Sequence, residues 1–343
     1  MTNINDITAD GINLPSSEGR TTYLSAISLK LALQGYFATQ HDVSPNVFLV
    51  RADGASAETD EDYSTGYTER CFETIIHLQH FAELVCKDLL RTDHPLLAVD
   101  AFNNPLLLYK LIHGERLTSE EVEGLRTIEF REALERACAI AKNGGSASDS
   151  AASLFLKWRE PLTKLNVLRN RLWHRGTFVL RYAPLDLFVG IHVLPFVREV
   201  VQQPWYSHME VLWKYKPLDC GIDPIEEIVK ETRKGETYSK SKVALLKEFA
   251  GAAYKNPIIF DDHPVAEQRN HTLRETAEKT ALAEVAAGLA AQVLKCPVCG
   301  FHSLLADMLH HVECTNCSLS VWIQFGDPES HGLHTKDRWF EIT

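Results

Sequence analysis

The sequence has no run of about 20 consecutive apolar residues, the length that a membrane-spanning helix requires. Its first stretch, MTNINDITADGINLPSSEGR, is polar and acidic, and it lacks both the basic start and the apolar core of a signal peptide. We therefore expect a cytoplasmic protein that does not associate with membranes.

Positive charge is also in short supply. Lys and Arg number 35 against 46 Asp and Glu, which gives a formal net charge of -11. A chain this acidic is not a general coat for nucleic acid, so a site for a polyanion must come from a local basic cluster.

Several catalytic signatures are absent. There is no phosphate-binding glycine loop, no G-x-S-x-G elbow and no H-E-x-x-H helix. These absences argue against a P-loop nucleotidase, an α/β-hydrolase and a metalloprotease of the H-E-x-x-H type.

What is present is a long chain with a soluble composition. Its 343 residues, 45% of them hydrophobic, suffice for two or three domains with cores of their own. The spacing of apolar residues favours a mainly α fold. We expect four parts: an N-terminal arm, helix and acidic linker (1–66), a helical bundle (67–204), a helical connector (205–294), and a small zinc ribbon with a tail (295–343).

Local signals set the expected elements. Thr118 and Glu121 have the spacing of a capping box, which predicts that a helix starts there. Pro161 should kink a helix or start a new one, and Gly176 should end it. Pro195 should kink a later helix. We expect helices over 21–40, 68–91, 118–142, 184–202, 223–234, 239–254 and 272–294, and a strand over 46–51.

Four of the eight cysteines form two pairs near the C-terminus. Cys296, Cys299, Cys314 and Cys317 follow the pattern C-x2-C-x14-C-x2-C. Two such pairs supply the four tetrahedral sulfur ligands of a structural Zn²⁺ site, and the pattern resembles a zinc ribbon. The alternative is a redox pair or unrelated buried thiols.

The other residues of this region do not change the expected ligand set. Three histidines lie in the loop between the two cysteine pairs, but four sulfurs already complete the coordination sphere. They are His302, His310 and His311. The ribbon could serve folding, dimer contacts, nucleic-acid binding or partner recognition, and the sequence does not choose between these roles. The remaining cysteines should be reduced and buried; they are Cys71, Cys86, Cys138 and Cys220.

One segment reverses the acidic balance of the chain. Between residues 157 and 181 the only acid is Glu160, and the bases are Lys157, Arg159, Lys164, Arg169, Arg171, Arg175 and Arg181. Such a cluster indicates an anionic partner, most simply a phosphodiester backbone. We therefore take RNA as the expected substrate, with Lys164, Arg171 and Arg175 as backbone-binding residues.

Arg169, Asn170 and His174 form a chemically useful trio within this segment. A histidine can transfer protons near neutral pH, and an arginine can hold a phosphate and stabilise charge in the transition state. RNA carries its own nucleophile, the 2′-hydroxyl, so cleavage requires no catalytic metal. On a regular helix Arg169 lies about 140° from His174, whereas Asn170 and His174 share a face.

Together these residues resemble a HEPN domain, a helical-bundle family found in many prokaryotic toxins and defence proteins. Its catalytic members carry R-x4–6-H with a polar residue directly after the Arg, which matches Arg169, Asn170 and His174. An earlier family helix reads as apolar residues, then Glu, then Lys; the segment FAELVCKDLL matches it with Glu83 and Lys87. The resemblance covers residues 67–203.

The resemblance implies a metal-independent endoribonuclease that works as a homodimer, in a toxin or antiphage-defence setting, with a possible antitoxin or defence-system partner. It implies that His174 acts as acid and base, that Arg169 binds the scissile phosphate, that Asn170 orients them, and that Glu83 fixes Arg169. One branch of the family carries a tyrosine two residues after the histidine, but Gly176 stands there, so its control by tyrosine modification is not supported.

Alternatives stay open. Glu83 can equally form an ordinary i,i+4 ion pair with Lys87. His174 can be a helix C-cap favoured by the helix dipole. The competing function is a non-catalytic, dimerising HEPN-like scaffold whose zinc ribbon recognises nucleic acid or protein.

Overall fold

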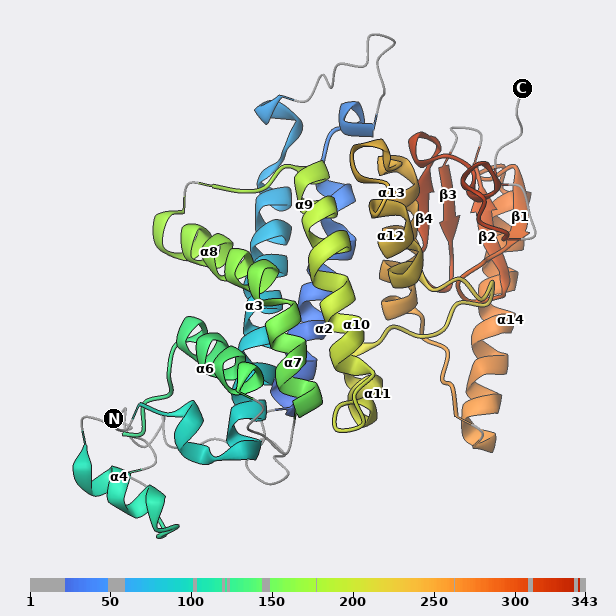
Figure 1. The fold of residues 1–343 in the computed structure, drawn as a ribbon. Helices are drawn as coiled ribbons and strands as arrows, with labels where there is room; N and C mark the ends of the chain where they lie inside the picture. The colour runs from blue at the N-terminus through green and yellow to red at the C-terminus, as the bar shows by residue number, and fades with distance from the viewer. Residues whose placement is uncertain are drawn as a thin grey trace, which may run out of the picture. The chain divides into compact units, whose positions relative to one another are not determined.

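The structure is a computed structural model, and it is mainly helical with a small antiparallel sheet near the C-terminus (Figure 1). It describes residues 22–48, 59–100, 104–118, 121, 124–143, 149–176, 178–261, 263–307, 311–335 and 339. The expected fold class, mainly α with a small cysteine-bearing ribbon, is confirmed. Within these residues no helix is both long enough and apolar enough to cross a bilayer.

The chain forms two compact units, and each is assembled from three chain segments. Unit 1 comprises Met1–Lys30, Ile76–Trp173 and Glu199–Trp213, and unit 2 comprises Leu31–Ile75, His174–Arg198 and Lys214–Thr343. Helices α2 (Thr22–Ala38) and α3 (Thr65–Asp93) contribute residues to both. The division into four successive parts therefore stays a prediction of the sequence.

Unit 1 is built around the second half of α3. Its apolar residues recur at helical spacing and are almost completely buried: Leu78, Phe81, Val85, Leu89 and Leu90. The surrounding helices are α4 (Pro105–Ile112), α6 (Phe130–Lys142), α7 (Asp149–Lys157), most of α8 (Arg159–Arg175) and α11 (Glu210–Trp213). The helices expected over 21–40 and 68–91 are thus confirmed with small shifts in their ends.

Within the helix expected over 118–142, Glu121 is helical, but the described residues 124–129 are not. The capping box itself forms, because the Glu121 N–H donates to Thr118 Oγ1 at 3.2 Å and the Thr118 N–H donates to Glu121 Oε2 at 2.9 Å. However, α6 begins only at Phe130. The intervening backbone pairs elsewhere: the Asp100 N–H donates to the Arg126 carbonyl at 2.9 Å, which takes residues near Arg126 out of a helix.

Proline and glycine set the ends of α8 as the sequence predicts. A separate helix starts at Arg159, with Pro161 in its first turn, where the missing N–H costs nothing. After Arg175, Gly176 adopts a φ of 61°, a left-handed conformation that glycine takes without strain. The strand expected over 46–51 is wrong where the structure describes it, because Pro45–Phe48 form a 3₁₀ turn.

Most of one long irregular helix belongs to unit 2, and its last residues belong to unit 1. Helices α9 (Tyr182–Phe188) and α10 (Leu194–Val201) are joined by a π-helical turn, Val189–Val193. The Leu194 N–H donates to the Val189 carbonyl, five residues back. The kink expected at Pro195 is therefore a π-helical turn that ends just before this proline, whose nitrogen carries no N–H to donate.

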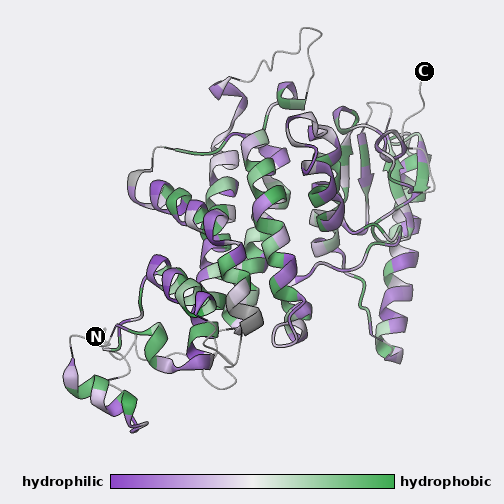
Figure 2. Ribbon diagram, viewed as in Figure 1, coloured by the Kyte–Doolittle hydropathy of each residue, from purple (hydrophilic) through white to green (hydrophobic). Residues whose placement is uncertain are grey.

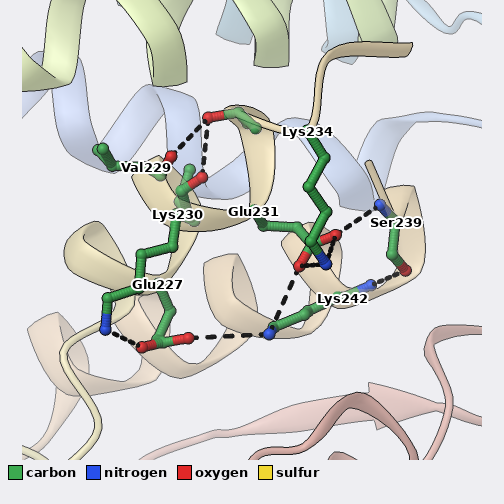
Figure 3. A network of polar contacts seen from close by, with 9 residues as sticks. Glu227, Val229, Lys230, Glu231, Lys234, Ser239 and Lys242 are labelled. Carbon is green, nitrogen blue, oxygen red and sulfur yellow. Dashed lines mark hydrogen bonds and ion pairs between the residues drawn. The ribbon is translucent and has the colours of Figure 1, made fainter. Parts of the chain in front are cut away.

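Helices α12 (Pro224–Thr232) and α13 (Lys240–Lys255) pack together and share an ionic network (Figure 3). Glu231, only 2% exposed, accepts hydrogen bonds from Lys234 at 2.8 Å and from the Ser239 N–H at 3.0 Å. Burial opposes its ionisation, but these hydrogen bonds outweigh burial and lower the pKa of Glu231. The network thus fixes the connection between the two helices.

Helix α14 spans Pro264–Ala286, earlier than the expected 272–294. It ends in a Schellman motif, in which the Gly288 N–H donates to the Val285 carbonyl at 3.0 Å and the Leu289 N–H donates to the Glu284 carbonyl at 3.0 Å. Gly288, with a φ of 74°, makes this ending possible. The helix is hydrophilic along much of its length (Figure 2).

The sheet follows α14 directly. Its antiparallel strands run in the order β1 (Gln292–Lys295), β2 (His302–Ala306), β3 (His311–Cys314) and β4 (Ser320–Trp322). Helix α14 packs against β1 and β2 (Figure 1). The turns β1–β2 and β3–β4 each carry one C-x-x-C pair, which places the two pairs on neighbouring hairpins.

Candidate functional site

The first cysteine turn is shaped by a glycine. The Cys296 N–H donates to the Phe301 carbonyl at 2.9 Å, and the Gly300 N–H returns to the Cys296 carbonyl at 2.9 Å. Gly300 has a φ of 75°, and a Cβ there would lie 2.4 Å from Asp219 Oδ1. Both the backbone conformation and the close approach therefore require glycine.

The second turn repeats this geometry. The Cys314 N–H donates to the Leu319 carbonyl at 2.8 Å, and the Ser318 N–H donates to the Cys314 carbonyl at 3.1 Å. Ser318 takes the left-handed position that Gly300 occupies in the first turn, with a φ of 56°. Each turn aims two sulfur atoms at a common centre, as a metal-binding knuckle does.

The four sulfur atoms lie where one metal ion would hold them. All four Sγ atoms are within 4.8 Å of one another. The distance is 3.6 Å from Cys296 to Cys317 and 3.7 Å from Cys299 to Cys314. A disulfide would need about 2.05 Å. A tetrahedral ion with bonds of about 2.3 Å to sulfur would separate its ligands by about 3.8 Å, so the cluster could hold a metal ion.

The surroundings of the cluster suit thiolate ligands. The four cysteines are buried, and Ser303 Oγ lies 3.2 Å from Cys314 Sγ. The Asn316 N–H donates to the same sulfur at 3.4 Å. Burial raises the pKa of the Cys296 thiol, so a bound cation would have to displace its proton.

The nearby histidines do not join the cluster where they are described. His311 stacks on Trp322 with ring centroids 4.3 Å apart, and its Nε2 lies 2.9 Å from Ser320 Oγ. His302 is exposed, and His310 lies outside the described residues. An ion bound by all four sulfurs would have no position open to a substrate, as in structural metal sites.

The second candidate site lies on α8. Arg169 is half-buried, and its Nη1 donates to Asn170 Oδ1 at 3.0 Å. Its guanidinium lies 5.5 Å from the centroid of the Trp173 ring, and its buried Nε has no hydrogen-bond partner among the described atoms. The arginine is therefore oriented by two neighbours and keeps hydrogen-bonding capacity.

The remaining predicted residues of α8 are mostly exposed. The Asn170, His174, Lys164 and Arg171 side chains are all open to solvent, and the Arg175 side chain lies outside the described part. Asn170 and His174 are one turn apart on a continuous helix, so they share a face. The structure thus brings Arg169 and Asn170 into contact and leaves His174 accessible.

Glu83 is engaged elsewhere. It accepts hydrogen bonds from Lys87 Nζ at 2.6 Å and from Gln79 Nε2 at 2.8 Å. Lys87 is itself buried and also donates to Thr127 Oγ1 at 3.2 Å. The i,i+4 pair is therefore present, and the proposed link from Glu83 to Arg169 stays a prediction.

His80 is a neighbour of this region that the sequence did not single out for a role. Its Nδ1 lies 2.8 Å from Ser28 Oγ. Burial lowers the pKa of His80, although the nearby charge of Glu83 acts in the opposite direction. The sequence signal is the spacing of His77, His80 and Glu83, which could be half of a metal site, but no second helix offers a matching ligand set.

A groove of about 800 Å³ runs between α6 and α8. The α8 wall includes Thr163, Val167 and Asn170, which recur at helical spacing on the face that His174 continues one turn later. The bases Arg159 and Lys164 of α8 also line the groove, and Glu160 is the acidic residue that α8 contributes to its wall. The groove therefore leads along α8 toward the predicted catalytic residues.

A fully buried ion pair is the other feature that the sequence did not reveal. Lys247 Nζ lies 2.5 Å from Asp186 Oδ1, with both side chains 0% exposed. The ammonium also lies 4.2 Å and 4.1 Å from the ring centroids of Tyr36 and Tyr182. These partners come from distant chain segments, so no local spacing could have shown them.

No family model, curated protein or solved structure matches this chain.

Proposed function

We propose that this protein is a metal-independent endoribonuclease that works as a homodimer and acts as a toxin or antiphage-defence effector. The observation that carries the proposal is the Arg169–Asn170 pair on α8, with Asn170 lining the groove and His174 exposed one turn later. An oriented guanidinium and an accessible imidazole are the two groups needed to cleave a phosphodiester of RNA, and one helix carries both.

The reaction uses the substrate's own nucleophile. The 2′-oxygen forms a bond to the adjacent phosphorus, and the bond from phosphorus to the 5′-oxygen breaks. One His174 accepts the 2′-hydroxyl proton, while His174 of a second copy donates a proton to the departing 5′-oxygen. Arg169 holds the phosphate and stabilises its developing charge. The products are a 2′,3′-cyclic phosphate and a 5′-hydroxyl.

We further propose that the ion held by Cys296, Cys299, Cys314 and Cys317 is Zn²⁺. Four buried sulfur ligands in two knuckles are the donor set of a structural zinc site, and the spacing between sulfurs fits zinc–sulfur bonds. The zinc stabilises the ribbon and takes no part in RNA cleavage.

The test is a cleavage assay on total RNA or tRNA without added divalent metal. EDTA is added immediately before the RNA, and the zinc content is measured afterwards to show that the ribbon stays loaded. We expect the wild type to generate cyclic-phosphate ends and both Arg169→Ala and His174→Ala to lose at least about a hundredfold in rate.

His208→Ala is the matched control, because His208 is an exposed histidine away from α8. It should cleave like the wild type. Absence of cyclic-phosphate ends from the wild type on every RNA would overturn the enzymatic proposal. Full activity in His174→Ala would instead show a real nuclease with a different site.

A second function is favoured by one contact. Glu83 is bound to Lys87 and Gln79, as expected for a scaffold helix. The competing proposal is therefore a non-catalytic, dimerising module whose ribbon recognises nucleic acid or protein. It predicts that RNA binds without being cut, and that Arg169→Ala leaves the products of any assay unchanged.

A further inference from the structure

A second cavity lies beside the first cysteine knuckle, within unit 2. Its volume is about 670 Å³, in the range of small-molecule sites. The knuckle contributes Val298, Cys299 and Phe301, and one face of α14 forms a wall. No part of the proposed cleavage reaction uses this cavity.

The walls of the cavity are held in place by specific hydrogen bonds. The Asp219 N–H donates to the Val298 carbonyl at 3.1 Å, and Lys295 Nζ lies 2.7 Å from Asp219 Oδ2. On another side, Asn270 of α14 accepts from the Ile259 N–H at 2.9 Å and donates to the Ile259 carbonyl at 2.7 Å. The segment around Asp219 is thus hydrogen-bonded to the knuckle, and the segment around Ile259 is hydrogen-bonded to α14. These bonds hold the walls in place, so the cavity is preformed.

The positively and negatively charged side chains of the cavity lie at different positions along its wall. Glu267 and Arg274 both line it from α14, and their seven-residue separation corresponds to about 10.5 Å along the helix axis. Arg274 is stacked on Phe301, 4.9 Å from the ring centroid. Asp261 also lines the cavity. Because Lys295 pairs with Asp219, the charged side chains left among the described lining residues are the Arg274 guanidinium and the Asp261 and Glu267 carboxylates, with His271 beside them.

The cavity also has an aromatic wall. Phe260 lines it and is 60% exposed, so much of its side chain is accessible to a ligand. An aromatic face accepts a flat ring by stacking. The ligand should therefore combine a planar ring, an anionic end for Arg274, and hydrogen-bond donors for the carboxylates.

We propose that this cavity binds a single nucleotide. The phosphate pairs with the Arg274 guanidinium, the base stacks on Phe260, and the donors on the base edge reach Asp261 and Glu267. Guanine fits best, because its Watson–Crick edge presents both an N1–H and an N2 amino group to a carboxylate, whereas uracil presents one donor. A free nucleotide and the 5′-phosphorylated end of an RNA strand share this chemistry, and the experiment below distinguishes them.

The test is isothermal titration calorimetry on the full-length, zinc-loaded protein with GMP, inosine monophosphate, UMP and guanosine. We expect GMP to bind tightest, inosine monophosphate and UMP more weakly, and guanosine about tenfold more weakly because it lacks the phosphate. Arg274→Ala and Phe260→Ala should each weaken GMP binding about tenfold or more. Glu267→Gln should reduce the preference for GMP over inosine monophosphate.

Arg269→Ala is the matched control, since Arg269 is an exposed arginine on α14 that does not line the cavity. It should bind GMP like the wild type. A 2′-O-methylated RNA tetramer with a 5′-phosphorylated G, which resists cleavage, separates the two sources: binding tighter than GMP identifies a strand end, and binding of GMP alone identifies a free nucleotide.

The proposal is overturned if neither ligand binds at millimolar concentration. It is equally overturned if GMP binds the Arg274→Ala and Phe260→Ala variants as well as the wild type while their zinc content and circular dichroism are unchanged. Binding of a basic peptide with no binding of GMP would reassign the carboxylates to a protein partner. Because the assay measures binding alone, its outcome is independent of whether the protein cuts RNA.

Discussion

At the scale of single residues, Glu248 shows most clearly how burial changes the pKa of a side chain. Its side chain is 4% exposed on α13, and burial raises its pKa to about 8. His41 Nδ1 lies 3.3 Å from Glu248 Oε1. Between the ordinary carboxyl pKa and pH 8, the folded protein therefore keeps a proton that the unfolded chain has lost.

This difference makes stability fall as pH rises. The raised pKa means that the contribution of Glu248 is fully present below the unfolded pKa and is lost as pH rises through about 8, with a slope of about 1.4 kcal/mol per pH unit. We expect Glu248→Gln to remove this slope. Urea unfolding of both proteins from pH 5 to 8 tests it; parallel pH profiles would contradict the prediction.

At the scale of elements, the π turn between α9 and α10 depends on close contact with α12. A Cβ added to Gly190 would lie 2.4 Å from Thr232 Oγ1. Thr232 is fully buried, and its hydroxyl bonds to the Ile228 carbonyl at 2.9 Å, so it cannot easily move away. The two helices can approach only because the chain has no side chain at this point.

We expect Gly190→Ala to lower the free energy of unfolding by about 1–3 kcal/mol through overpacking. Gly251→Ala is the matched control on α13, where the nearest atom to an added Cβ is the Phe37 carbonyl oxygen at 3.9 Å. That change should be neutral or stabilising. Denaturant unfolding measures both, and adding Thr232→Ala should cost less in the Gly190→Ala background than in the wild type.

At the scale of the whole molecule, the cysteine cluster links metal content to folding. The two knuckles belong to a short sheet of four strands, whose apolar core is too small to be stable alone. An ion bound by the four cysteines would add to the stability that packing against α14 supplies, because metal-binding free energy becomes folding free energy when ligands converge only in the folded chain.

We expect the purified protein to contain one zinc ion per chain and to lose thermal stability when a chelator removes it. Cys314→Ser should abolish stoichiometric zinc. Cys138→Ser should retain it, because Cys138 is a buried cysteine outside the cluster whose thiol contacts the Phe155 carbonyl. Atomic emission and thermal unfolding with and without chelator check both; zinc-free wild type of equal stability would refute the assignment.

Patterns within a few residues of sequence predicted those parts of the fold that depend on interactions between neighbouring residues. The apolar period of α3, the proline start and glycine stop of α8, and the C-x-x-C spacing all act within a few residues. Where a predicted element is wrong, a distant partner took the backbone: Asp100 pairs with Arg126 and prevents an early start of α6. Glu83 follows the short-range rule, since it pairs with Lys87 four residues later, which is one of the two alternatives that the sequence left open.

By itself, the sequence determined the mainly helical class and the four sulfur ligands, because helix period and knuckle spacing are encoded locally. It also placed Arg169, Asn170 and His174 on one helix. Only the tertiary structure decided that Asn170 lines a groove, that Lys247 is buried against Asp186, and that Arg274 stacks beside a cavity at the knuckle. These features join segments far apart in the chain, and such contacts form only when the apolar faces of those segments are buried together.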